Sequence, residues 1–189
     1  YSTYIDSKNI KWICTDGGGL SQIINDAVIP FKTVLTDSIA KTIYNVTEDG
    51  QGSIWINIAD QGLVKYSADT IIHLTELSGL KTNAIQSINT DAYGNIVISS
   101  NEGIDIYNIE TNTYEFHGEP EKVAYLEPNL NATFKDYFGN IWVGTSKGID
   151  KFNVKDLISK NYREKEGFLG VEPNPNSVCK DHFGNLWFG

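Results

Sequence analysis

The chain has 189 residues, and its 24 acidic and 15 basic side chains give a formal net charge of −9. This balance argues against nucleic acid, and against direct contact with an anionic membrane surface, because both partners require a basic footprint. No apolar run approaches the roughly 20 residues that span a bilayer. Seventeen glycines, five prolines and a supply of Ile, Val, Thr and Tyr favour strands joined by tight turns.

A motif that occurs five times dominates the sequence. Its form is D-x-x-G-N-[IL]-W-[IV]-x-T, followed after two or three residues by G-[IL]-x-x-[FYI]. All tryptophans of the protein occupy one column of this motif, which Val97 fills in the third copy; they are Trp12, Trp55, Trp142 and Trp187. The copies are spaced by 42 to 45 residues and begin at Asp6, Asp49, Asp91, Asp136 and Asp181. The chain is therefore built of repeats.

Each unit is predicted to contain four short strands in a fixed order. A segment such as 84–91 precedes the Asp and has the two-residue apolar period of a half-buried strand. In the turn D-x-x-G-N, we expect the Asp carboxylate to accept backbone N–H groups and the Gly to supply a positive φ. A variable segment such as 111–118 reads as a fourth, outer strand. In the fourth unit, residues 141–145 and 149–152 are predicted to form the second and third strands around a turn at 146–148.

Repeated units of four antiparallel strands predict an all-β fold, a β-propeller with four-stranded antiparallel blades. A helical solenoid is excluded, because no sustained 3.6-residue apolar period appears. Residues 1–189 supply about four blades and one additional motif, whereas propellers close with about 4–8 blades. We therefore expect a partial propeller that is a fragment of a larger one, with a four-bladed ring as the alternative. Such an open arc exposes blade faces and is expected to be unstable alone or to form a homodimer.

The five copies resemble the two-component regulator propeller repeat, which occurs in the sensor regions of hybrid two-component system histidine kinases, notably in Bacteroidetes. The resemblance covers essentially the whole chain. It includes the motif itself and the segments GLKTNAIQSINTD (79–91) and EGFLGVEPNPNSVCKDHFGNLWFG (166–189). Departures from the family pattern include Asn9 and Cys14 for Gly in the first copy, and Val97 for Trp and Ser99 for Gly in the third.

This resemblance implies a periplasmic sensor region of an inner-membrane protein. In the family, rings of blades are followed by a small immunoglobulin-like domain, a membrane helix and a cytoplasmic histidine kinase. The propeller senses a small extracellular ligand, often an oligosaccharide. We therefore expect a sensor module that is not itself an enzyme, needs no cofactor, and works with the remaining blades and the kinase of the full-length protein.

Two other functions remain open, a propeller lyase and a protein-interaction scaffold. Streptogramin lyase-like propellers have a similar D-x-x-G-x-[IL]-W-F-T rhythm and use metal-assisted elimination with a catalytic His. The three histidines of this chain, His73, His117 and His182, fall at unrelated repeat positions. Cys14 and Cys179 form no metal-binding cluster, and no nucleophile or phosphate-loop motif is present. The sequence therefore predicts neither a catalytic residue nor a metal site.

A ligand is expected at the end of the ring where the second strand turns into the third and where connections lead into each inner strand. Loops on a rigid scaffold commonly carry function, and the Asn and Asp side chains that are frequent there suit sugar hydroxyls as well as turns. The longest connection, residues 168–177, is the strongest candidate. The predicted ligand-binding residues are Glu172, Asn174, Asn176, Asn131, Asn83, Lys147, Asn101 and Glu102. The repeated Trp is instead expected to pack between blades.

Overall fold

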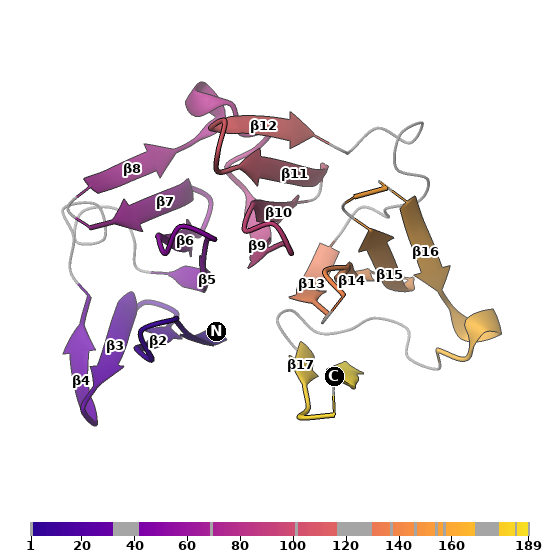
Figure 1. The fold of residues 1–189 in the computed structure, drawn as a ribbon, viewed down its shortest axis with the longest axis horizontal. Helices are drawn as coiled ribbons and strands as arrows, with labels where there is room; N and C mark the ends of the chain where they lie inside the picture. Colours follow the sequence, from indigo (N-terminus) through magenta and orange to yellow (C-terminus); the bar gives the residue numbers. More distant parts are fainter. Residues whose placement is uncertain are drawn as a thin grey trace.

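The fold consists of antiparallel sheets arranged as an arc of blades around a common centre (Figure 1). The computed structural model describes residues 2–31, 42–68, 70–100, 102–116, 130–136, 138–145, 147–153, 155–156, 158–168, 178–183 and 185–188. Within these ranges the chain forms four four-stranded sheets and one two-stranded sheet. The first strand of each blade lies nearest the centre of the arc and the fourth lies outermost. The predicted partial β-propeller with four-stranded antiparallel blades is thus confirmed.

Each complete blade is a meander in which consecutive strands pair with one another. The first blade contains β1 (Ser2–Ile5), β2 (Lys11–Cys14), β3 (Leu20–Ile24) and β4 (Ala27–Pro30). The second contains β5 (Ile43–Glu48), β6 (Ile54–Ile58), β7 (Gly62–Ser67) and β8 (Thr70–Leu74). The third contains β9 (Ile85–Thr90), β10 (Ile96–Ser100), β11 (Gly103–Asn108) and β12 (Thr113–Phe116). The fourth contains β13 (Leu130–Lys135), β14 (Ile141–Thr145), β15 (Gly148–Asn153) and β16 (Ile158–Tyr162).

A partial fifth unit follows the four blades. It is a hairpin of β17 (Val178–Lys180) and β18 (Leu186–Phe188). Two short 3-10 helices, η1 (Glu76–Ser78) and η2 (Glu164–Glu166), follow the second and fourth blades. In the part of the chain that the structure describes, no helix has the length and apolar character needed to cross a membrane.

The core lies between the blades, where the facing sides of neighbouring blades pack together in three clusters of buried side chains. All five residues of β6 are buried. Its two-residue alternation places Ile54, Ile56 and Ile58 in a cluster with Trp12 of the first blade, and Trp55 in a cluster with side chains of the third. A strand covered on both faces can be apolar throughout, which explains the continuous apolar run in this motif.

The tryptophan column fills the space between successive blades, as predicted. Trp12 and Trp55 are 1% and 0% exposed. The ring of Trp55 lies 4.9 Å from that of Tyr107 on the next blade. In the third copy Val97 takes the column and is also fully buried, in a cluster with Ile141 of the fourth blade. The column is therefore a packing position wherever a neighbouring blade covers it.

Candidate functional site

The repeated Asp builds the first turn of each unit through one set of hydrogen bonds. In the second copy, Oδ1 of Asp49 accepts the backbone N–H groups of Gln51 and Ser53, each at 2.9 Å. Its Oδ2 accepts the indole Nε1–H of Trp55 at 2.8 Å. The equivalent indole bonds join Trp12 to Asp6, Trp142 to Asp136 and Trp187 to Asp181, at 2.9, 2.8 and 3.1 Å. The turn-forming role of the Asp is confirmed, and the indole bond adds a tie between the turn and the second strand.

The carboxylate of this turn is held in its ionised form. Burial alone would raise the pKa of Asp49, but hydrogen bonds from Trp55 and Ser53 and the charge of Lys65 hold that pKa below its ordinary value. Lys65 Nζ lies 3.3 Å from the Asp49 carboxylate and 5.2 Å from the centre of the Trp55 ring. The sequence did not indicate this Asp–Trp–Lys cluster, although the constant six-residue spacing of Asp and Trp is a signal for it.

The glycine of the first turn has a positive φ, as predicted. The φ angles of Gly52, Gly94 and Gly139 are 81°, 86° and 82°. Asn9 replaces this glycine in the first copy and has a φ of 61°. Asn reaches the left-handed region at lower cost than most residues, so this departure from the motif preserves the turn.

The opposite end of the blades carries the region where the sequence predicts a ligand. There the turn between the second and third strands of one blade contacts the connection that leads into the next. The hydroxyl of Thr42 donates to the carboxylate of Asp16 at 2.7 Å. The backbone N–H of Gly62 donates to the carbonyl of Asn83 at 3.1 Å. These bonds bring the two kinds of predicted loop together at one end of the arc.

Asn83, one of the predicted ligand-binding residues, is engaged in a local structural contact. Its side-chain Oδ1 accepts the backbone N–H of Glu76 at 2.9 Å, and Glu76 Oε1 accepts the backbone N–H of Asn83 at 2.9 Å. This reciprocal pair holds η1 against the connection into the third blade. The side chain of Asn83 therefore has a structural role, because its Oδ1 already accepts this hydrogen bond.

Glu102 and Lys147 occupy equivalent places in the turns of the third and fourth blades, and both are exposed. The backbone N–H of Glu102 donates to the hydroxyl of Ser100, and that of Lys147 to the hydroxyl of Thr145, both at 3.2 Å. These hydrogen bonds stabilise the backbone of the two turns, and the side chains of Glu102 and Lys147 lie at the surface. The other predicted residues cannot be placed: Asn131 lies in β13 with its side chain outside the described part, and Asn101, Glu172, Asn174 and Asn176 lie outside the described residues.

A buried charged cluster at the same end was not foreseen from the sequence. Asp150 on β15 is fully buried, and its Oδ1 accepts hydrogen bonds from Arg163 Nη1 at 2.7 Å and Asn161 Nδ2 at 2.8 Å. Arg163 also donates to the carbonyl of Ile149 at 3.0 Å. The guanidinium therefore fixes the connection that leaves the fourth blade. The sequence shows a carboxylate in this column in the third and fourth copies, Asp105 and Asp150, but it does not show that only Asp150 has an arginine partner.

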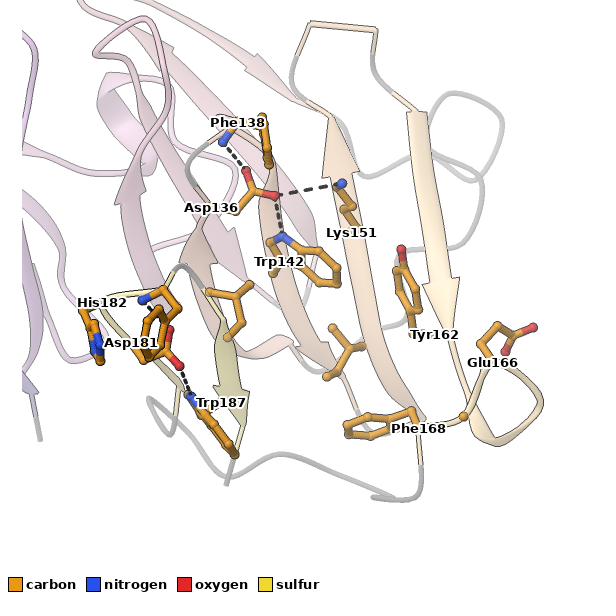
Figure 2. A pocket seen from close by; sticks show the side chains of 14 residues that line it. Asp136, Phe138, Trp142, Lys151, Tyr162, Glu166, Phe168, Asp181, His182 and Trp187 are labelled. Carbon is orange, nitrogen blue, oxygen red and sulfur yellow. Dashed lines mark hydrogen bonds and ion pairs between the residues drawn. The ribbon is translucent and has the colours of Figure 1, made fainter.

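A groove of about 990 Å³ lies between the fourth blade and the β17–β18 hairpin (Figure 2). Trp142 on its wall stacks against Tyr162, with ring centres 5.3 Å apart, and Lys151 Nζ lies 5.3 Å from the centre of the Trp142 ring. Figure 2 shows Asp136 bonded to Trp142 on one side of the groove and Trp187 on the other. The groove is thus rich in aromatic rings and carboxylates.

Comparison with the second blade explains why this groove is present on the fourth. Trp142 and Lys151 occupy the same motif columns as Trp55 and Lys65. In the second blade these side chains are covered by Tyr107, which comes from the third strand of the following blade. We therefore interpret the groove as a blade-packing face rather than as a ligand site.

The described histidines lie in different units of the arc. His73 lies on outer strand β8 with Nε2 2.7 Å from the carbonyl of Gln61, whereas His182 is exposed in the fifth unit; His117 lies outside the described residues. Within the described ranges, no group of three or more His, Cys, Asp and Glu side chains is placed to hold a metal ion. Burial raises the pKa of the Cys14 thiol to about 11, so this thiol is protonated at neutral pH.

The four-stranded blades and the repeated Asp turn define the chain as a partial β-propeller. Comparisons with known proteins show which propellers it is similar to. No protein-family model matches the chain. Among curated proteins, histidine kinase P4 of Formosa agariphila is 28% identical over 138 residues, which cover 69% of this chain and 10% of the kinase.

Solved structures extend this likeness to the whole chain. The extracellular domain of a B. thetaiotaomicron protein assigned to the hybrid two component systems has a TM-score of 0.81 and 22% identity, over 100% of this chain and 26% of that domain. A second such domain has a TM-score of 0.73 and 24% identity, with 28% of it covered. Virginiamycin B lyase of Staphylococcus aureus has a TM-score of 0.70 and 15% identity, with 62% of the lyase covered.

The chain is therefore similar to extracellular propeller domains of hybrid two-component systems and is a distant relative of a histidine kinase, which confirms the resemblance found in its sequence. It spans 10% of the kinase and about a quarter of each bacterial domain. At these identities the solved structures show the fold, and the lyase shares that fold as well.

Proposed function

We propose that the chain is part of the periplasmic, ligand-sensing region of a two-component sensor histidine kinase. The observation that carries this proposal is the likeness of the whole chain to extracellular domains of hybrid two-component systems, in a protein whose sequence also matches part of a histidine kinase. The propeller would bind an extracellular molecule, and the kinase part of the full-length protein would respond to it.

We further propose that residues 1–189 belong to a larger sensor region with additional blades. The exposure of the tryptophan column supports this step, because Trp187 is 61% exposed whereas Trp12 and Trp55 are buried. Trp142 likewise faces a groove rather than a neighbouring third strand. A further blade would cover these side chains in the way that the third blade covers Trp55.

An oligosaccharide is the ligand class that we propose. Glu102 and Lys147 lie exposed at equivalent points of neighbouring blades, above turns that Ser100 and Thr145 brace. A carboxylate accepts and an ammonium donates hydrogen bonds, so the pair can bind several hydroxyls of one sugar chain. Binding would signal only if the sensing and resting states differ in their affinity for the sugar.

Two measurements test the proposed function. The coding sequence that follows Gly189 is expected to encode further blades, a membrane helix and a histidine kinase, and a gene without kinase motifs would contradict the proposal. The complete propeller region is then screened for thermal shifts with neutral and acidic oligosaccharides, because a ligand that binds only the folded state raises Tm. A response to peptides, with none to any sugar, would favour a protein-interaction scaffold instead.

A further inference from the structure

An open cavity of about 710 Å³ with both polar and apolar side chains on its wall lies at the centre of the arc, on the inner strands of the blades. Its walls come from β1, β2, β5, β9 and β17, so the first, second, third and fifth units all contribute. Figure 1 shows how the inner strands surround this centre, where β17 approaches from the side opposite the second blade. The polar side chains on its wall include Thr3, Tyr4, Asn45, Thr47, Ser87 and Asn89.

The wall of this axial cavity is uncharged. Among the described residues that line it, none has an ionised side chain at neutral pH, although 21% of the chain is charged. Hydroxyls and amides alternate there with the apolar side chains of Ile13, Val46, Ile88 and Val178. A charged ligand would lose hydration in this cavity without gaining a counter-charge. A neutral molecule with many hydroxyls and apolar patches would satisfy both kinds of surface.

Hydrogen bonds between neighbouring inner strands hold the wall in place. Asn45 Nδ2 on β5 donates to the carbonyl of Ile88 on β9 at 2.9 Å. Asn57 Nδ2, on the strand behind, donates to Asn45 Oδ1 at 3.1 Å and so fixes the orientation of that amide. The hydroxyls of Thr47 and Thr90 lie 2.9 Å apart across the same boundary. A wall braced in this way loses little conformational entropy when a ligand binds.

Three of the lining side chains are accessible to a ligand. Thr3 on β1 is exposed, and Asn89 on β9 and Val178 on β17 are partly exposed. These three positions belong to the first, third and fifth units. A molecule that touched all three would connect units that are far apart in the sequence.

We propose that the axial cavity is a binding site for a neutral, hydroxyl-rich ligand, such as the end of an uncharged oligosaccharide. The proposal rests on the proposed sensing function and adds a second contact region to the loops at the end of the blades. A ligand in this position bridges units of the arc and favours the arrangement in which all of them reach it. Sugar binding would thereby be coupled to the relative position of the blades.

Calorimetric titration of the complete propeller region tests the site with maltotriose, cellotriose, xylotriose and mannotriose as neutral probes and trigalacturonic acid as an acidic one. The test variant is Thr3→Glu, which places a carboxylate beside the cavity. Its matched control is Thr70→Glu on the exposed outer strand β8, which makes the same change far from the cavity. We expect at least one neutral trisaccharide to bind, with affinity lowered at least tenfold by Thr3→Glu and unchanged by Thr70→Glu. Asn89→Ala, which adds no charge, should also weaken binding.

The variant Lys147→Glu, in the turn of the fourth blade, distinguishes a failure of the axial site from a failure of the proposed function. Binding that persists in Thr3→Glu and Asn89→Ala but is lost in Lys147→Glu would overturn the axial site and leave sugar sensing at the loops intact. Tighter binding of trigalacturonic acid than of every neutral probe would also overturn the axial site. A chain that binds none of the probes, while its circular dichroism spectrum shows intact strands, would overturn both the axial site and the proposed ligand class.

Discussion

At the scale of the residue, the carboxylate of the repeated Asp stabilises the first turn of each unit by hydrogen bonds. It accepts two backbone N–H groups of its own turn in all five copies, and the indole N–H of the following strand in four. In the third copy Val97 replaces Trp, and Asn95 Nδ2 donates to Asp91 Oδ2 at 3.0 Å instead. The second carboxylate oxygen is therefore satisfied in every copy, by an indole, by an amide, or by both as in the fourth and fifth copies.

Removal of this carboxylate should destabilise the blade most where the cluster is buried. Asp49→Asn weakens the bonds from the turn and from Trp55 and leaves Lys65 Nζ without its anion, so we expect a loss of about 3 kcal/mol in the free energy of unfolding. Trp55→Phe keeps a ring but loses the indole bond and should cost about 2 kcal/mol. Urea denaturation of both variants and of the double variant gives the coupling between the two side chains. Asp181→Asn, at the exposed copy of the turn, is the control, and an equal loss there would contradict the prediction.

A buried aspartate on the third blade, Asp105, predicts a free energy of unfolding that falls as the pH rises. Burial raises the pKa of Asp105 to about 6, against the bond and charge of Lys81, from an ordinary value of 3.8. Because the folded pKa lies above the unfolded one, the favourable contribution is complete below pH 3.8 and is lost as the pH rises through about 6. Asp105→Asn should therefore raise the free energy of unfolding at pH 7 by about 2 kcal/mol and have little effect at about pH 4.

Asp150 provides the control for this prediction, because it occupies the same motif column on the fourth blade but pairs with Arg163. Asp150→Asn should destabilise the chain at pH 7, since the guanidinium loses its partner. Chemical denaturation at the two pH values measures both variants. The same sign for the two substitutions at pH 7 would show that burial does not govern Asp105.

At the scale of the element, the turn between the second and third strands depends on a glycine with no room for a side chain. Gly62 has a φ of 81°, and a Cβ there would overlap the carbonyl oxygen of Leu74 and approach Asn83 Oδ1 to 3.3 Å. Gly17 also has a positive φ, 76°, but a Cβ there would meet nothing within 4 Å. Gly62→Ala should therefore cost about 3 kcal/mol and Gly17→Ala about 1 kcal/mol. Equal costs in thermal or urea denaturation would mean that the close contact is relieved elsewhere.

The sequence predicts the elements that all copies share, because the repeat superimposes the same pattern five times. The inner strands, the Asp turn and the tryptophan column follow from a two-residue period, a D-x-x-G spacing and a constant apolar position. Features of single copies could not be predicted. Asn83 is held by Glu76 and Asp150 by Arg163, and such contacts depend on where a particular connection folds back. The uncharged axial cavity could not be predicted for the same reason, because its wall is assembled from strands of four units that lie 40 or more residues apart in the sequence.

At the scale of the whole molecule, the two tryptophans that are not fully buried, Trp142 and Trp187, predict the effect of further blades. In a longer protein that includes the next unit, Trp142 and Trp187 should be shielded from solvent as Trp12 and Trp55 already are. Acrylamide quenching of tryptophan fluorescence should therefore be weaker in the longer protein, and its free energy of unfolding should be higher, because more apolar surface is buried. Unchanged quenching would show that the arc does not continue through this face.

Ligand-dependent phosphorylation in the full-length protein tests the proposed sensing function most directly. We would measure autophosphorylation in proteoliposomes, with and without the sugar identified by the thermal-shift screen. The double variant Glu102→Ala/Lys147→Ala is compared with Glu110→Ala/Lys155→Ala, which alters exposed residues in the turns at the opposite end of the same two blades. We expect the sugar to change the phosphorylation rate in the natural protein and in the second variant, and to have at least a tenfold weaker effect in the first. A kinase whose rate is the same with and without the sugar would contradict the proposed function.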